Sequence, residues 1–262
     1  MKSYLLGIDI GTSACKVAVF DRNGKVLAAA SGDYPVYYPH EGWAEQNPEE
    51  WWDAVCRATK ETIQKADITA DEIAGIGIDG QSWSAIPIDR EGNVLANTPI
   101  WMDTRAQSIC DRLNQEIGQE EIFEVAGNSL QPSYSTAKIL WYKENLPEVY
   151  AKIYKILQSN SYIAFKLTGA VTQDVSQGYG LHCFNMKKGC WDEKMCKRLG
   201  IPMEFLPEIC DCDHVVGTVT GKAAAECGLV EGIPVVAGGL EAACGTLGAG
   251  AVSYTHLRAH ET

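Results

Sequence analysis

The stretch GIDIGTSACKV, residues 7–17, decides the fold that the sequence predicts. An aspartate and three small residues stand between its two apolar runs: Asp9, Gly11, Thr12 and Ser13. Residues 3–9 are typical of a buried strand, and the alternation over residues 14–20 is typical of a second one. A plain hairpin turn is the alternative explanation of the stretch on local evidence, because Gly, Asp, Thr and Ser all favour turns.

The composition of the chain argues against nucleic acids and anionic membranes as binding partners. The 262 residues are 46% hydrophobic and carry a formal net charge of −12. An acidic chain of this kind does not suit nucleic acid or an anionic membrane, because phosphate neutralisation needs clustered Lys and Arg. We expect a cytoplasmic location, since the sequence shows neither a membrane span nor the apolar core of a signal peptide.

The ten cysteines have no paired C-x-x-C spacing. Cys210, Cys212 and His214 form a short C-x-C-x-H run, but a zinc site needs a fourth ligand and usually a second paired element. The sequence therefore favours free thiols in a reducing compartment.

The last ten residues, SYTHLRAHET, differ abruptly from the small apolar residues before them. They resemble the translated adaptor read-through found at the ends of assembled reading frames. We therefore expect one domain over residues 1–252, truncated at its carboxyl end, and a non-native tail over residues 253–262.

The order of predicted elements narrows the fold. A helix begins with Asn47 as N-cap, Pro48 at its first position and Glu50 placed to complete a capping box. The other expected elements are strands at 3–9, 14–20, 25–31, 73–80 and 84–89, helices over 104–157 and 160–169, then a strand, a helix and a strand over 215–239, and a last helix from 240.

This order differs from a dinucleotide-binding fold, because the glycines near residue 9 lie between two strands rather than between a strand and a helix. No G-x-x-x-x-G-K-[ST] phosphate loop occurs either. Three strands followed by helix, strand and helix, with an acidic turn after the first strand, suit a ribonuclease-H-like (actin-like ATPase) α/β domain. We expect a mixed sheet with flanking helices, in which residues 73–80 add a parallel strand beside the first.

Four stretches carry a family resemblance: GIDIGTSACKVAVFD, GWAEQNPEEWW, IGIDGQSWSAIPIDREGNVL with IWMDTRA, and IPVVAGGLEAACGTLGAGAV. In this order they resemble the N-terminal domain of the FGGY carbohydrate kinases, most closely the xylulokinase branch, over residues 4–252. The resemblance implies ATP-dependent phosphorylation of a small-molecule sugar, such as the ketopentose D-xylulose, with ATP and Mg²⁺ as cofactors. It also implies a second actin-like half, missing from this sequence, that supplies the adenine pocket, and it allows a homodimer of the full-length protein.

The resemblance and the residue chemistry agree on a phosphate turn, the name used below for residues 11–13. Backbone N–H groups of Gly11, Thr12 and Ser13 can form an anion-binding nest, to which Lys16 adds positive charge. Asp9 is expected to hold Mg²⁺ through water. An ordinary surface lysine is the alternative for Lys16.

The third stretch offers polar groups and an aromatic wall for a polyol. The expected substrate-binding residues are Gln81, Ser82, Trp83, Trp101, Asp103 and Arg105. Core packing is the alternative for the two tryptophans, and an ion pair is the alternative for Asp103 and Arg105. Xylulokinases typically carry Met-His where this chain has Ser82-Trp83, so the sequence leaves the identity of the sugar open.

Glu241 occupies the position of the family's catalytic aspartate, which accepts the proton of the sugar hydroxyl. A glutamate keeps the charge and reaches one methylene further. Two other functions remain open: a non-catalytic actin-like module that binds a sugar or a partner, and a different ATPase of the same superfamily. For the kinase, five residues should converge on one cleft: Asp9, Thr12, Gln81, Asp103 and Glu241.

Overall fold

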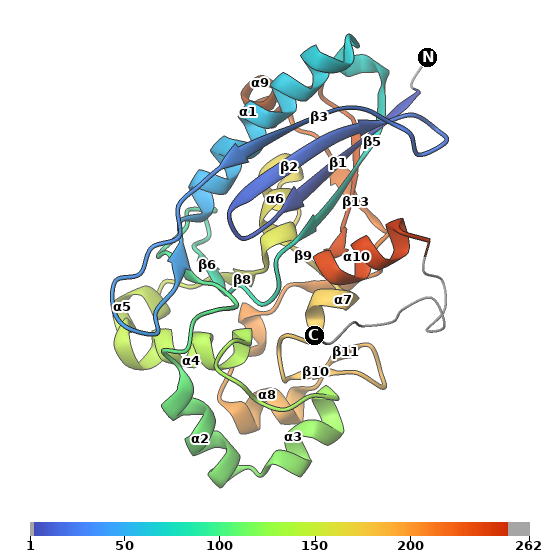
Figure 1. Ribbon diagram of the computed structural model, residues 1–262. Helices are drawn as coiled ribbons and strands as arrows, with labels where there is room; N and C mark the ends of the chain where they lie inside the picture. Colours follow the sequence, from blue (N-terminus) through green and yellow to red (C-terminus); the bar gives the residue numbers. More distant parts are fainter. Residues whose placement is uncertain (1–2, 251–262) are drawn as a thin grey trace, which may run out of the picture.

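A seven-stranded mixed sheet forms the centre of the computed structural model (Figure 1). Its strands run in the order β13-β14-β5-β1-β2-β3, and β15 pairs with the carboxyl end of β5. They are β1 (Tyr4–Ile10), β2 (Ala14–Phe20), β3 (Val26–Asp33), β5 (Ile73–Gly80), β13 (Val215–Thr218), β14 (Pro234–Val236) and β15 (Gly239–Leu240). β1 therefore lies inside the sheet, between β5 and β2.

The structure describes residues 3–250. The expected tail over residues 253–262 and the expected domain end at residue 252 lie outside this range, and both stay predictions. Within residues 3–250, no helix has both the length and the hydrophobicity needed to cross a membrane.

The pairing of the first strands confirms the expected fold. β1 pairs antiparallel with β2, β2 pairs antiparallel with β3, and β5 joins β1 in parallel. Alternate side chains of β1 and β2 enter the core, namely Leu6, Ile8, Ile10, Cys15, Val17 and Val19. This alternation fixes the register, because a slip by one residue would turn these apolar side chains to the opposite face of the sheet.

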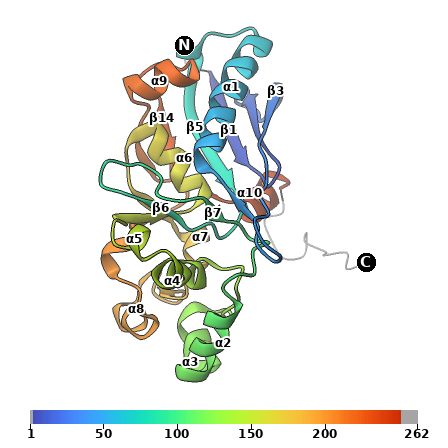
Figure 2. The same ribbon diagram turned by 90° about the vertical axis from the view of Figure 1, so that its left-hand side faces the viewer.

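Three helices cover one face of the sheet: α1 (Pro48–Ala66), α6 (Ser159–Thr168) and α9 (Gly221–Cys227) (Figure 2). α1 packs on β2 and β3, α6 packs on β5, and all three helices contact one another. On the opposite side, α10 (Glu241–Gly248) follows directly after β15. The start of α10 is thereby placed at the carboxyl ends of β1 and β5.

α1 begins as expected, with one difference. The Asn47 side chain accepts a hydrogen bond from the Glu49 N–H, and Pro48 occupies the first turn. The expected capping box at Glu50 is wrong. The Glu50 carboxylate instead accepts the Tyr37 hydroxyl, with 2.7 Å between the oxygens.

The chain between β5 and β13 forms a second, mainly helical part with its own apolar cluster (Figure 1). Its helices are α2 (Gln107–Glu116), α3 (Gln119–Ala126), α4 (Ser135–Asn145), α5 (Pro147–Tyr150), α7 (Val175–Gly178) and α8 (Glu193–Leu199). Short 3₁₀ helices occur at η1 (Ala70–Glu72) and η2 (Met203–Phe205).

Short two-stranded ladders join segments that are distant in sequence. They pair β4 (Glu45–Gln46) with β7 (Thr98–Pro99), β6 (Ile86–Ile88) with β8 (Lys155–Leu157), β9 (Thr172–Asp174) with β12 (Glu208–Cys210), and β10 (Phe184–Asn185) with β11 (Cys190–Trp191). The expectation of helix up to residue 157 is therefore wrong at its end, because β8 pairs antiparallel with β6. The expected end of α6 at Gly169 is confirmed, with φ of 78°.

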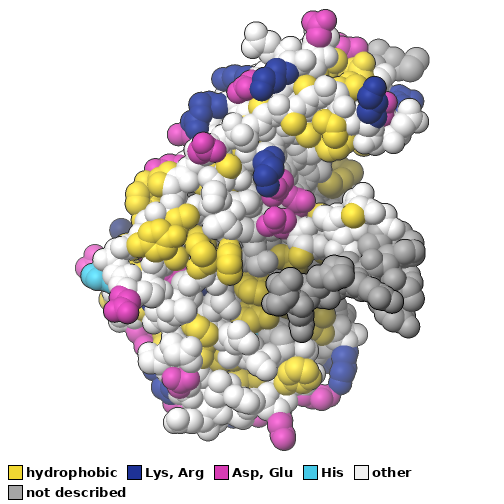
Figure 3. All heavy atoms as spheres, in the orientation of Figure 1, with side chains coloured by type: hydrophobic (Ala, Val, Ile, Leu, Met, Phe, Trp, Pro, Cys, Tyr) yellow, Lys and Arg dark blue, Asp and Glu magenta, His cyan; other side chains and the backbone are white. Residues whose placement is uncertain are grey.

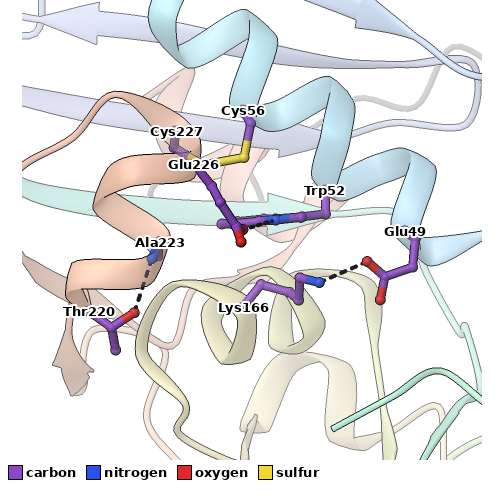
Figure 4. Close-up of a disulfide and its surroundings, with 8 residues drawn as sticks. All are labelled: Glu49, Trp52, Cys56, Lys166, Thr220, Ala223, Glu226 and Cys227. Carbon is purple, nitrogen blue, oxygen red and sulfur yellow. Dashed lines mark hydrogen bonds and ion pairs between the residues drawn. A yellow bond between two sulfur atoms is a disulfide. The ribbon is translucent and has the colours of Figure 1, made fainter.

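A disulfide between Cys56 and Cys227 joins α1 to α9 (Figure 4). Beside it, the Trp52 indole N–H donates to a Glu226 carboxylate oxygen at 2.7 Å. The expectation of free thiols is wrong for this pair, because the packing of α1 against α9 brings together two cysteines far apart in sequence. The remaining cysteines are free, namely Cys15, Cys110, Cys183, Cys190, Cys196, Cys210, Cys212 and Cys244.

Candidate functional site

Two aspartates stand side by side at the carboxyl ends of β1 and β5. The parallel register pairs Asp9 with Asp79, so both side chains point to the same face. On the other edge of β5, Gly239 of β15 lies opposite Asp79, and Glu241 starts α10 two residues later. Lys16, opposite Asp9 on β2, places its Nζ 2.9 Å from Asp9 Oδ2. Figure 3 shows acidic side chains beside a basic one near the middle of this face.

Three of these groups, Asp79, Glu241 and Lys16, have pKa values shifted by their surroundings. The pKa of Asp79 is raised to about 7, first by burial and then by the carboxylates of Asp9 and Glu241. Burial and the Asp9 charge also raise the pKa of Glu241. The hydrogen bond to Asp9 raises the pKa of Lys16. With three carboxylates and one ammonium, the cluster favours a bound cation.

The aspartate pair fits a hydrated magnesium ion. Oδ1 of Asp9 and Oδ1 of Asp79 are buried and have no hydrogen-bond partner in the protein. Mg²⁺ is usually held by one or two carboxylates and keeps several waters. Among the described residues, no three His, Cys, Asp or Glu side chains are grouped so as to enclose a metal. The fit to magnesium therefore depends on the two unpartnered oxygens of Asp9 and Asp79.

The phosphate turn is held in place by buried side chains. The Tyr34 hydroxyl donates to the Gly11 carbonyl at 2.6 Å, and Gln46 Nε2 donates to the Thr12 carbonyl at 2.8 Å. A Cβ at Gly11 would lie 3.0 Å from the Ala14 carbonyl oxygen, so the turn has little room for a larger residue. These contacts leave the Thr12 hydroxyl free to bond outside the turn.

Gln81 lies against this turn. Its backbone N–H donates to the Ile10 carbonyl at 2.8 Å, and its Nε2 donates to Gln46 Oε1 at 2.8 Å and more weakly to the Gly11 carbonyl at 3.4 Å. Gln81 Oε1 is buried without a partner. The structure thus brings Gln81 beside the turn, with one polar atom unused.

The two tryptophans that were expected to bind the substrate have different surroundings. Trp101 is 43% exposed, and its indole N–H donates to Thr12 Oγ1 at 3.0 Å. Trp83 follows the half-buried Ser82 and stacks on Tyr134, with ring centroids 4.2 Å apart. Its indole Nε1 is buried and has no partner. Trp101 therefore reaches the phosphate turn, while Trp83 belongs to an aromatic cluster that also contains Tyr179.

Asp103 and Arg105 are turned into the protein. Arg105 Nε lies 3.0 and 2.9 Å from the two Asp103 oxygens, and Arg105 Nη2 lies 2.7 Å from Glu45 Oε2. The guanidinium packs over Trp43 and Trp141, 3.9 and 4.9 Å from their ring centroids. The Asp103 and Arg105 side chains are only 0% and 3% exposed. This network would have to open before either side chain could touch a sugar, so their substrate contact stays a prediction.

Comparison with known proteins identifies the family of this chain. Residues 4–248 match the N-terminal domain of the FGGY family of carbohydrate kinases. The chain belongs to this family.

The chain is similar to several FGGY proteins. It is 33% identical to xylulose kinase of Bacillus subtilis over 95% of this chain and 50% of that protein. It is 31% identical to glycerol kinase of Thermococcus gammatolerans over 83% and 45%. The crystal structure of xylulose kinase from Rhodospirillum rubrum superposes with a TM-score of 0.91 at 27% identity, over 95% and 51%. The chain thus spans about half the length of the curated FGGY relatives it matches.

Sequence reasoning missed three residues near this FGGY site: Asp79, Tyr134 and Lys138. The tripeptide Gly-Ile-Asp stands one residue before the end of both β1 and β5, and this repeat could have revealed Asp79. Lys138 is fully buried on α4, and burial lowers its pKa to about 7. A lysine within a helix gives no sequence signal for such burial.

His182, whose ring lies 5.1 Å from Tyr134, should make the protein sensitive to acid. Burial lowers its pKa to about 4 from 6.5. Between these pH values the unfolded chain binds a proton that the folded protein excludes. The free energy of unfolding should therefore fall by about 3 kcal/mol as pH drops from 6.5 to 4. Urea unfolding at pH 7 and pH 4.5 measures this loss.

The variant His182→Gln should reduce that pH dependence, whereas His40→Gln, at an exposed histidine, should leave it unchanged. An equal loss of stability in wild type and His182→Gln would contradict the assignment.

Proposed function

We propose that the protein to which this chain belongs is an ATP-dependent carbohydrate kinase. The reaction would transfer the γ-phosphoryl group of ATP to a hydroxyl of a ketopentose such as D-xylulose. One observation carries the proposal: a carboxylate, Glu241, begins α10 beside Asp9 and Lys16, at the strand ends next to the phosphate turn. Phosphoryl transfer needs this combination of a base with a phosphate and cation site.

Glu241 is proposed as the general base. Burial and the nearby Asp9 charge raise its pKa, which makes it a stronger proton acceptor than an ordinary glutamate. The carboxylate would accept the proton of the attacking sugar hydroxyl as the new oxygen–phosphorus bond forms. ADP leaves with the electrons of the broken bond. Glu241 is the first residue of a helix that follows β15 directly, and this fixes where its side chain leaves the backbone.

The phosphate turn and Lys16 are proposed to bind the nucleotide phosphates. The N–H groups of residues 11–13 would donate to phosphate oxygens, and the Lys16 ammonium, 65% exposed, is available to move toward them. Asp9 would hold Mg²⁺, with Asp79 beside it. When bound, Mg²⁺ neutralises charge on the phosphate groups during transfer.

The sugar is proposed to lie against Trp101 and Trp83, with Gln81 at one end. Gln81 Oε1 and Trp83 Nε1 are polar atoms without partners, one an acceptor and the other a donor. A sugar hydroxyl can use both kinds of atom, and leaving them buried and unpaired is costly. The names of the relatives, xylulose kinase above all, favour a pentulose as the substrate.

The test is made on this chain completed to the length of its relatives. Release of ADP is measured with ATP, Mg²⁺ and a panel of D-xylulose, L-xylulose, glycerol and gluconate. We expect release with a pentulose. If the folded protein releases no ADP with any member of the panel, the proposal is wrong, and sugar binding without turnover would support the non-catalytic module instead.

A further inference from the structure

Lys138 is a buried lysine with an unusual set of partners. Its side chain is fully buried within α4. The Nζ donates to three backbone carbonyls, those of Trp83 at 2.8 Å, Ile100 at 2.8 Å and Ser133 at 2.6 Å. An ammonium has three N–H bonds, so all of its donors are used. An apolar side chain of equal length would fill the same space without the cost of burying a charge.

The three carbonyls have one property in common. Each belongs to an aromatic residue or directly precedes one: Trp83 itself, Trp101 after Ile100, and Tyr134 after Ser133. We call Trp83, Trp101 and Tyr134 the aromatic wall. Trp83 stacks on Tyr134, and Trp101 bonds the phosphate turn through Thr12. One ammonium therefore ties together three separate segments that each carry part of this wall.

Trp83 in particular needs such support. Its φ of 61° lies in the left-handed region, which a bulky residue rarely adopts. Such a conformation persists only where its surroundings hold it, and it is common at ligand sites. The Trp83 backbone carbonyl accepts a hydrogen bond from Lys138 Nζ. The Trp83 backbone N–H donates to Gln177 Oε1 at 3.4 Å. Gly180 leaves room for the indole, because a Cβ there would lie 2.5 Å from Trp83 Cδ1.

We infer that Lys138 is a positioning residue that sets the arrangement of the aromatic wall and thereby the affinity for the sugar. The inference rests on the proposed function, which places the sugar against this wall. It assigns no contact between Lys138 and substrate. None of the three carbonyls belongs to the phosphate turn, and the wall reaches that turn through the Trp101 bond to Thr12, so sugar binding should respond more strongly than nucleotide binding.

The first experiment compares Lys138→Met with Lys155→Met in the completed protein. Lys155 is the matched control, since its ammonium also donates to a backbone carbonyl, that of Leu206 at 2.8 Å, but lies on β8 and touches none of the wall residues. We expect Lys138→Met to raise KM for the sugar about tenfold or more, with KM for ATP nearly unchanged. Lys155→Met should change neither constant.

Chemical rescue covers the case in which Lys138→Met does not fold. Lys138→Ala leaves space for n-propylammonium, which restores the missing carbons and all three N–H bonds. The variant is purified with the amine, and KM for the sugar is measured before and after the amine is removed. We expect a reversible rise on removal. No response to the amine in a folded Lys138→Ala variant would overturn the inference, as would equal sugar KM values in Lys138→Met and wild type.

A measurement made without substrate shows whether the inference about Lys138 is wrong or the proposed function is wrong. Lys138→Met should shift tryptophan emission and increase acrylamide quenching, because the stacking of Trp83 on Tyr134 loosens. Since the chain has seven tryptophans, the measurement is repeated with Trp83→Phe, which should remove most of the difference. If wild type phosphorylates no sugar but this shift occurs, the proposed function fails while Lys138 still positions the wall. If Lys138→Met shifts emission no more than Lys155→Met does, the positioning role is wrong.

Discussion

Replacing Glu241 with glutamine is expected to lower the rate of sugar phosphorylation by the completed protein at least 100-fold, on the order of the general-base contribution. A neutral amide cannot accept the hydroxyl proton, although it keeps the size and position of the carboxylate. The measurement is kcat from ADP release, with KM for ATP as a check that the nucleotide still binds. Glu241→Asp should preserve or raise the rate, because it restores the shorter reach that is usual in the family.

Glu204→Gln is the matched control, since Glu204 is exposed within η2 and far in sequence from the strand ends. It should leave kcat unchanged. If Glu241→Gln also retained the full rate, Glu241 would have no part in the chemistry, and the non-catalytic interpretation of this position would gain support.

Replacing Arg105 with methionine is expected to lower the free energy of unfolding by about 3–5 kcal/mol, the usual cost of removing one partner of a buried ion pair. The Asp103 carboxylate, 0% exposed, would keep its bonds to the N–H groups of Ala44 and residue 105 but would lose its only cation partner in the described network. Glu45 would lose the same partner. Urea unfolding of the 262-residue chain measures the change.

Lys187→Met supplies the comparison for this loss. Lys187 pairs with Glu124, and both side chains are more than two-thirds exposed, at 70% and 73%. Exposed pairs contribute about 0–1 kcal/mol, so this variant should stay close to wild type. Similar losses in the two variants would show that the Arg105 network contributes no more than a surface pair.

Long, periodic elements were predictable from the sequence. The alternation in residues 4–20 gave β1 and β2, and the Asn47-Pro48 pair gave the start of α1. The segments that failed are short strands such as β8 and β9, with three residues each. Three residues show no measurable periodicity, and their pairing depends on distant segments such as β6 and β12 that local patterns do not specify.

The candidate site likewise contains residues that the sequence could identify and residues that it could not. Asp9, Thr12, Gln81 and Glu241 lie around adjoining strand ends and could be chosen by motif, because each lies at or just after the end of a strand or begins a helix. Their functional roles remain predictions. Asp103 has a motif signal of equal strength, yet its side chain is turned inward toward Arg105. Side-chain direction in a loop such as the one that carries Asp103 depends on three-dimensional packing, which the sequence does not display.

The bond between Cys56 and Cys227 turns the intervening chain into a closed covalent ring with two open arms. Asp9 lies on the amino-terminal arm and Glu241 on the carboxyl-terminal arm, and the sheet brings the two arms together. A single peptide cut inside the ring leaves every residue covalently attached, whereas a cut between Asp9 and Cys56, or between Cys227 and Glu241, detaches one of these carboxylates. While this bond is oxidised, the chain can therefore be cut once anywhere between the two cysteines and remain one covalent piece.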